Sequence, residues 1–91
     1  MEFDNLPGGD IIRQGIEDLS AGRQTVPALL VAVGAPRLRR CGLDVPERSL
    51  PSPEHRLYEL LTRADGATAH SRYNALLRRL VSFERALECA G

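Results

Sequence analysis

The sequence predicts an all-α fold: a compact bundle of four main helices that ends in a long carboxy-terminal helix. In the last third of the chain, apolar residues recur at spacings of three and four, which is the rhythm of a helix packed along one seam. Earlier segments keep a helical period between prolines and glycines that would end helices. One short apolar run could be a strand, but no other segment offers it a partner.

Length and composition point to one small domain over residues 1–91. Such a chain buries about 60 to 65% of its unfolded surface, which is enough for one core. The 12 acidic and 12 basic residues balance, so no general affinity for nucleic acid or anionic membranes is expected. All the basic residues are arginine, which is typical of codon usage in a GC-rich, bacterial genome.

The first helix is predicted at Asp10–Ala21, after an irregular amino terminus over residues 1–9. Asp10 is a good N-cap residue, and Gly22 follows the last apolar position. Three apolar residues then share one face: Ile12, Ile16 and Leu19. Gly15 weakens this helix, so any purpose it has is close packing against a neighbour.

A second helix is predicted to begin at Thr25, with Pro27 in its first turn. The following segment, residues 28–33, is apolar all round and must be central to the core. A buried strand is the alternative for these six residues. The cap and the proline favour a helix.

Gly34, Ala35 and Pro36 are expected to interrupt the second helix. A short extra helical turn should then cover Pro36–Cys41, closed by Gly42. A kinked continuous helix is the alternative. The proline-rich connector over residues 43–52 has no periodicity and is expected to be a surface loop.

The third helix is predicted to be capped by Ser52 and opened by Pro53, and to stop at Asp65 and Gly66. Glu59 precedes Arg63 by four residues, the favourable order for an ion pair on a helix. Three of its residues are expected to point inward: Leu57, Leu61 and Ala64.

The last helix is predicted to be capped by Thr68 and to serve as the spine of the bundle. Its seam consists of six residues: Tyr73, Leu76, Leu80, Phe83, Leu87 and Ala90. The other helices are about half as long, so its far end is expected to be left uncovered. A second copy of the chain could then associate around Phe83 and Leu87.

The best-marked polar group is His70, Ser71 and Arg72, in the first turn of the last helix. Free N–H groups and positive partial charge at a helix amino terminus favour a phosphate or carboxylate there. The alternative is an ordinary solvated helix start, because no glycine-rich phosphate loop precedes these residues.

Arg63 and His70 form an R-x6-H spacing that is similar in outline to the R-x4-6-H element of HEPN-type ribonucleases. In that family the arginine and histidine lie together at a dimer interface and act on RNA. The resemblance implies a small RNA-processing site near the start of the last helix. It covers two residues, and here Asp65 and Gly66 should break the helix between them.

Residues 26–43 allow a degenerate helix-turn-helix interpretation, with Gly34 at the turn. Three arginines could then contact nucleic acid: Arg37, Arg39 and Arg40. Against this, Arg40 falls where the motif needs a core residue, and Pro36 and Gly42 leave barely two helical turns. The alternative is a packed apolar helix followed by a solvated basic turn.

The chain offers little for metal or nucleophilic chemistry. Its softer candidate ligands, Cys41, His55, His70 and Cys89, show no short zinc-type spacing. The two cysteines are expected to be free, buried thiols. No catalytic residue, metal or cofactor is predicted.

The amino terminus lacks the pattern of a secretory signal, and the longest apolar run, Ala28–Val33, is too short to span a membrane. A soluble, cytoplasmic protein is therefore expected. The interpretation that the sequence favours is a small non-enzymatic interaction or regulatory module with a protein partner. A nucleic-acid-binding regulator is the first alternative, and an anion- or RNA-processing site is the second.

Overall fold

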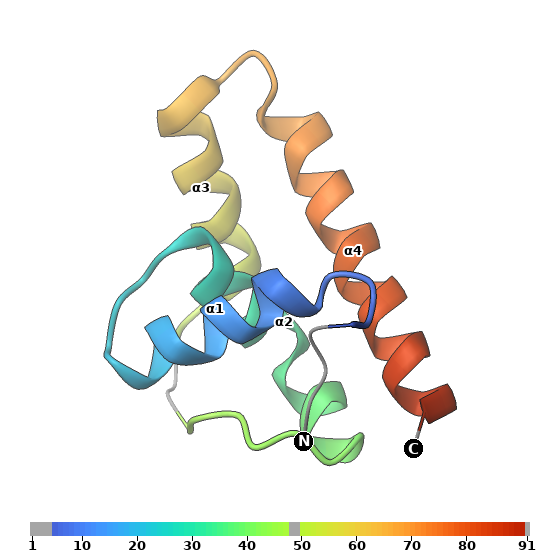
Figure 1. Ribbon diagram of the computed structural model, residues 1–91. Coiled ribbons are helices and arrows are strands. Elements are labelled where there is room, and N and C mark those ends of the chain that lie inside the picture. Colours follow the sequence, from blue (N-terminus) through green and yellow to red (C-terminus); the bar gives the residue numbers. More distant parts are fainter. Residues whose placement is uncertain (1–4, 48–49, 91) are drawn as a thin grey trace.

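The computed structural model describes residues 5–47 and 50–90, and over these ranges the chain forms four helices and no strand (Figure 1). The helices are α1 (Gly9–Ser20), α2 (Val26–Arg40), α3 (Pro53–Asp65) and α4 (Ala69–Ala90). The predicted all-α bundle with a long last helix is confirmed. Residues 1–4 of the predicted irregular terminus, residues 48–49 of the connector and the side chain of Ala90 lie outside the description.

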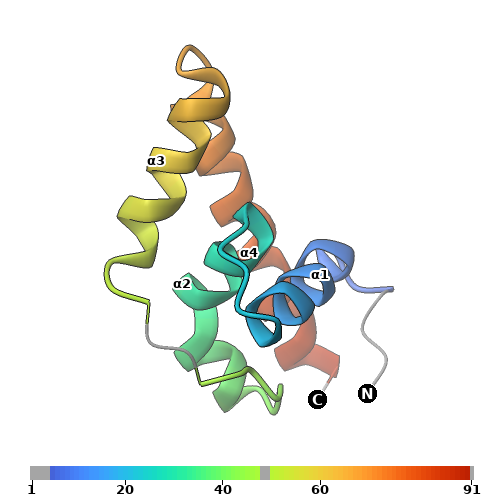
Figure 2. The same cartoon turned by 90° about the vertical axis from the view of Figure 1, so that its left-hand side faces the viewer.

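The helix α2 lies at the centre of the arrangement. Helices α3 and α4 are antiparallel and form a V with its apex at the turn of residues 66–68 (Figures 1 and 2). Helix α2 lies between the two ends that are far from this turn. Helix α1 packs across α2 on the other side. The molecule measures 38 × 24 × 17 Å. One side of α4 is exposed, at Arg78, Val81, Ser82 and Arg85.

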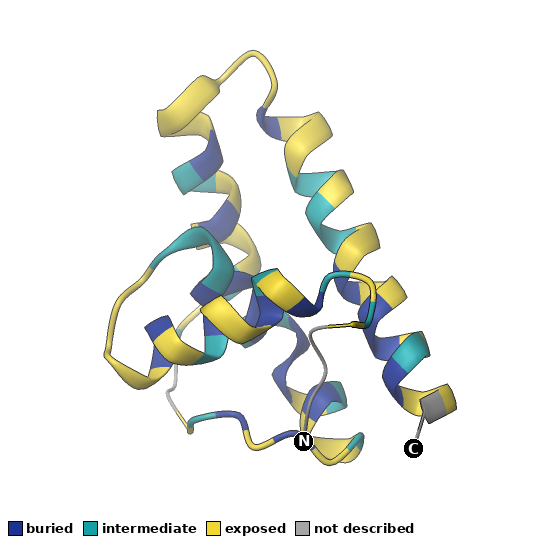
Figure 3. Cartoon of the chain, in the orientation of Figure 1, coloured by how far each residue is buried: buried dark blue, intermediate teal, exposed yellow. Residues whose placement is uncertain are grey.

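All four helices contribute to one apolar core (Figure 3). Its fully buried large side chains are Ile12, Leu29, Leu30, Val31, Leu38, Leu57, Leu61 and Phe83. Helix α2 supplies four of these: three come from its first two turns, which apolar residues surround, and Leu38 comes from its second half. The segment 28–33 is therefore a helix, as the cap and proline indicate, and not a strand.

The junction between α1 and α2 has the N-cap and the close packing that the sequence predicts. The Thr25 side chain accepts a hydrogen bond from the N–H of Ala28, as predicted for an N-cap, and Pro27 lies in the first turn. A Cβ atom on Gly15 would lie only 2.8 Å from the carbonyl carbon of Pro27. Gly15 thus permits the close packing that the sequence suggested as its purpose.

The start of α1 differs from the prediction. Its N-cap is Gly8, in the left-handed region at φ 77°, and Asp10 lies within the first turn. A Cβ on Gly8 would lie 3.0 Å from the carbonyl oxygen of Arg79, so a glycine lets this turn approach α4. Asp10 instead forms an ion pair with Arg79, at 3.1 Å.

The predicted break after the second helix is wrong, because α2 continues through Pro36 to Arg40. No separate turn exists at Pro36–Cys41; the continuous-helix alternative is correct. Proline removes one helical hydrogen bond, at a cost of about 3 kcal/mol. Packing of Leu38 in the core, together with ion pairs from Arg37 to α4, offsets that cost and keeps the second half helical.

The connector and α3 differ from expectation in detail. Leu43 and Val45 are buried, so the connector covers part of the core as well as crossing the surface. Ser52 occupies the predicted N-cap position with φ 49°, but its side chain makes no capping hydrogen bond. Leu57 and Leu61 are buried as predicted, whereas Ala64, in the last turn of α3, is exposed.

Across the described residues, no helix is both long and apolar enough to cross a membrane. The seam of α4 is confirmed along its second half, where Leu80, Phe83 and Leu87 are buried. Tyr73 and Leu76 are only half-buried. Tyr73 packs edge-to-face against Tyr58 of α3, which is itself exposed.

Candidate functional site

A polar cluster joins the second half of α2 to the end of α4. The guanidinium of Arg37 lies 2.8 Å from the Glu88 carboxylate and 3.5 Å from that of Glu84. Glu84 is buried, and its burial raises the pKa of its carboxyl above the ordinary value of 4.5; Arg37 opposes that shift, and Glu88 adds to it. The cluster is an interhelical clamp, in which one guanidinium from α2 holds two carboxyl groups of α4.

Space for this clamp comes from Gly34. A Cβ at that position would lie 2.8 Å from a methyl group of Leu80 and 3.1 Å from Glu84. The Cys41 thiol is the nearest nucleophile, at 3.9 Å from Glu88. The cluster therefore joins α2 to α4 through ion pairs and a contact between a thiol and a carboxylate.

The three arginines predicted as nucleic-acid contacts do not act together. Arg37 is held by the clamp, and the guanidinium of Arg39 donates hydrogen bonds to the backbone carbonyls of Val45 and Pro46. Arg40 is exposed and, of the three, is the one that forms no hydrogen bond or ion pair with another described residue. The segment therefore presents one free guanidinium to solvent.

The three residues of the predicted anion site are all exposed, but they do not converge. Successive residues on a helix point about 100° apart, so His70, Ser71 and Arg72 face different directions. His70 lies 3.2 Å from the amide nitrogen of Asn74 and contacts the ring of Tyr58. Arg63, the other half of the R-x6-H spacing, pairs with Glu59 on its own helix.

The expectation that the end of α4 is left uncovered is wrong. Phe83 is fully buried and Leu87 is 2% exposed, because α2 and the turn before α1 pack against this part of α4. A second copy could reach these two side chains only if the core opened. The cysteines are free, as predicted, but Cys89 is exposed and Cys41 is half-buried.

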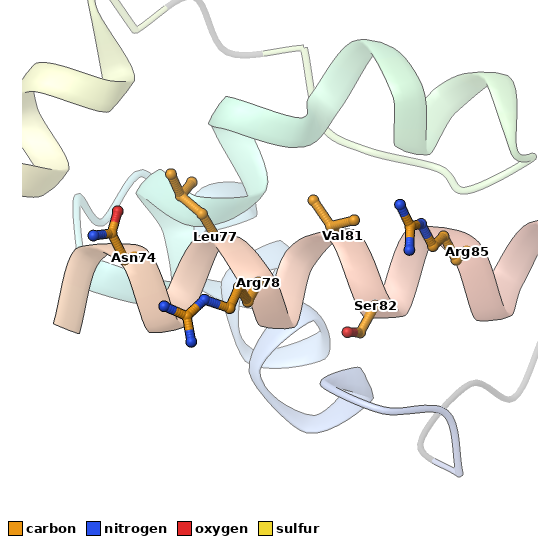
Figure 4. A pocket seen from close by; sticks show the side chains of 6 residues that line it. All are labelled: Asn74, Leu77, Arg78, Val81, Ser82 and Arg85. Carbon is orange, nitrogen blue, oxygen red and sulfur yellow. The ribbon is translucent and has the colours of Figure 1, made fainter. Parts of the chain in front are cut away.

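An open hollow of about 570 Å³ runs along the exposed side of α4. Six side chains line it: Asn74, Leu77, Arg78, Val81, Ser82 and Arg85. They form two neighbouring rows in which successive residues are four positions apart: Asn74, Arg78 and Ser82 in one, and Leu77, Val81 and Arg85 in the other. The hollow is the groove between these two ridges of α4. Figure 4 shows Leu77, Val81 and Arg85 along one edge of the helix and Arg78 and Ser82 along the other. We call this feature the α4 groove.

The α4 groove combines apolar and basic groups. Val81 is 37% exposed, which is high for a large apolar side chain, and Leu77 is half-buried beside it. Arg78 and Arg85 are exposed, and neither forms a hydrogen bond or ion pair with another described side chain. By contrast, Arg79 of the same helix is paired with Asp10. The groove contains no carboxylate.

Aromatic side chains extend this surface toward the turn between α3 and α4. Tyr58 is, with Val81, one of the two large apolar residues that are exposed in the described part of the chain. Its ring makes edge-to-face contacts with Tyr73 at 5.3 Å and His70 at 6.4 Å between ring centres. The contact between His70 and Asn74 joins this cluster to the groove. The sequence signal for the surface is the position of Leu77 and Val81, which are apolar yet lie outside the predicted seam.

The remaining features of the described chain offer little chemistry. No three histidine, cysteine or acidic side chains in it are grouped to hold a metal ion. A smaller hollow of about 210 Å³ is lined by Gln24, Leu29, Leu50, Pro51 and Arg56, and its arginine pairs with Glu59. Neither hollow brings a nucleophile and a base together.

Comparison with known proteins gives no relative for this chain: no family model, no curated protein and no solved structure matches it.

Proposed function

We propose that this protein is a non-enzymatic interaction module that holds a helix of another protein in the α4 groove. The groove between two ridges of a helix is the shape into which the ridge of a second helix packs. Val81 and Leu77 provide apolar surface that the chain itself leaves open to solvent. This exposed groove is the observation that carries the proposal.

The distribution of charged groups also favours a binding role. Asp18 and Glu84, the two carboxyl groups that are buried among the described residues, are each engaged by an arginine of the same chain. A general acid or base needs access to substrate, and these groups are committed to holding helices together. The candidate nucleic-acid arginines Arg37 and Arg39 are engaged in the same way.

A photo-crosslinking residue at position 81 tests the proposal in cells that express the protein. The matched control carries the same residue at position 72, on the opposite side of α4. We expect a discrete crosslinked protein from position 81 alone, with the crosslink mapped by mass spectrometry to a helix-forming segment. Identical products from both positions, or none from position 81, would show that the α4 groove is not the interface.

A further inference from the structure

We infer that the occupant of the α4 groove is an amphipathic helix with two acidic residues about seven positions apart, an inference that rests on the proposed function. The argument begins with Arg78 and Arg85. Both are exposed, and neither has a partner among the described side chains. They are separated by about two helical turns, or roughly 10.5 Å along the axis.

Among the described residues, no acidic side chain pairs with Arg78 or Arg85. Glu84 and Glu88 lie on the same helix but are held by Arg37 on the α2 side. Asp10 is occupied by Arg79. The groove therefore presents positive charge at two points, and a partner with complementary charges is favoured over a basic one.

The position of the apolar groups sets the pattern of the partner. Leu77 and Val81 lie along one ridge of the groove. Val81 lies between the two arginines in the sequence, and Leu77 directly precedes Arg78. A helix packed at about 20° to α4 lies nearly along it, so residues seven apart on the two helices stay in step. An apolar residue three or four positions after the first acidic residue would then meet Val81: three when the two helices are parallel and four when they are antiparallel.

A second copy of this chain is a poorer occupant. In a two-fold interface centred on Val81 and Ser82, Arg78 of each copy would face Arg85 of the other. Like charges placed opposite each other disfavour association. The charges of Arg78 and Arg85 thus favour an acidic helix in the groove and disfavour a second copy of the chain.

The probe for this inference is a capped synthetic peptide of about 18 residues, alanine-rich with a leucine stripe and two glutamates seven positions apart. A matched peptide has lysines in place of the glutamates. We expect the acidic peptide to bind about tenfold more tightly in fluorescence anisotropy at low ionic strength, with added salt weakening it. The double variant Arg78→Glu/Arg85→Glu should reverse this preference.

The control variant is Arg72→Glu, which makes the same charge change on the same helix about 120 to 140° away from the two arginines. It should keep the preference of the parent, and circular dichroism should show all variants folded. Equal binding of the two peptides, or a preference unaffected by the double variant, overturns the inference. If neither peptide binds while position 81 still crosslinks a partner, the inferred pattern of acidic residues is overturned and the proposed function stands. If position 81 gives no crosslink, the proposed function is overturned as well. Sedimentation that shows a dimer abolished by Val81→Arg would assign the groove to a second copy and overturn the inference.

Discussion

The carboxylate of Asp18 accepts a hydrogen bond of 2.6 Å from the hydroxyl of Thr25, and so links the end of α1 to the start of α2. The same hydroxyl accepts from the N–H of Ala28 at 3.3 Å. Gln14 and Arg23 also donate to Asp18, which is almost wholly buried. The N-cap of the central helix is therefore oriented by a buried carboxylate from the helix before it.

Removing the Thr25 hydroxyl should destabilise the fold. We expect Thr25→Ala to lower the free energy of unfolding by about 1 kcal/mol, since it removes the N-cap bond and one donor to Asp18. The control is Thr62→Ala, where an exposed hydroxyl donates only to the carbonyl of Tyr58 in the same helix. Chemical denaturation should show a change of less than about 0.5 kcal/mol there. Equal losses at both positions would contradict the capping role.

Asp18 should make the fold sensitive to acid. The hydrogen bond from Thr25, with those from Gln14 and Arg23, lowers the pKa of Asp18 below its ordinary value of 3.8. The resulting stabilisation is fully present above the ordinary value and is lost as pH falls through the lowered one.

Unfolding free energies measured across this acid range should therefore fall more steeply in the parent than in Asp18→Asn. The matched control Asp44→Asn removes an exposed carboxylate with no contact to another described side chain. It should keep the steep parental slope. A slope that Asp18→Asn leaves unchanged would argue against this contribution.

A methyl group at Gly15 should be harmful even though alanine favours helices. The added Cβ would approach the backbone of Pro27 and Val31 Cγ2, and the two helices would have to separate. We expect Gly15→Ala to lower the free energy of unfolding by about 1 to 3 kcal/mol. Gly66→Ala is the control, because its Cβ would meet nothing closer than 3.5 Å and its φ of −60° suits alanine. Thermal melts should show Gly66→Ala unchanged or slightly stabilised; a tolerated Gly15→Ala would mean that α1 packs differently.

Leu80 and Val81 are neighbours in the chain that should respond oppositely to the same change. Leu80 is buried against α2, so Leu80→Asp places an unpaired charge in a core whose total stability is about 5 to 14 kcal/mol and should unfold the protein. Val81 faces solvent in the α4 groove, so Val81→Asp should remain folded. Circular dichroism distinguishes the two. Unfolding of both variants would show that Val81 is part of the core.

Local sequence signals predicted the helices well where caps and apolar spacing agree. Thr25 and Pro27 mark the start of α2, and Asp65 and Gly66 mark the end of α3, as the structure has them. Pro36 misled the prediction because contacts distant in sequence, from Arg37 to Glu84 and Glu88, hold the helix together beyond the proline.

The candidate site could not be predicted in the same way. Whether Phe83 or Val81 is exposed depends on which side of α4 the other helices cover, and that is a tertiary property. The sequence predicted Phe83 and Leu87 as the accessible pair, whereas α2 and the turn before α1 cover them. The spacing of Leu77 and Val81 beside Arg78 and Arg85 contains the signal, but only the arrangement of α2 and α3 shows that this face is open.

A nuclear magnetic resonance titration of the ¹⁵N-labelled protein with the acidic peptide tests the α4 groove most directly. The account predicts concentration-dependent shifts for Leu77, Arg78, Val81 and Arg85, with the amides of residues 37–40 unaffected. The lysine peptide should cause much smaller changes at the same concentrations. Shifts centred on the arginines of α2, or no shifts along α4 at saturating peptide, would contradict the assignment of this face as the binding surface.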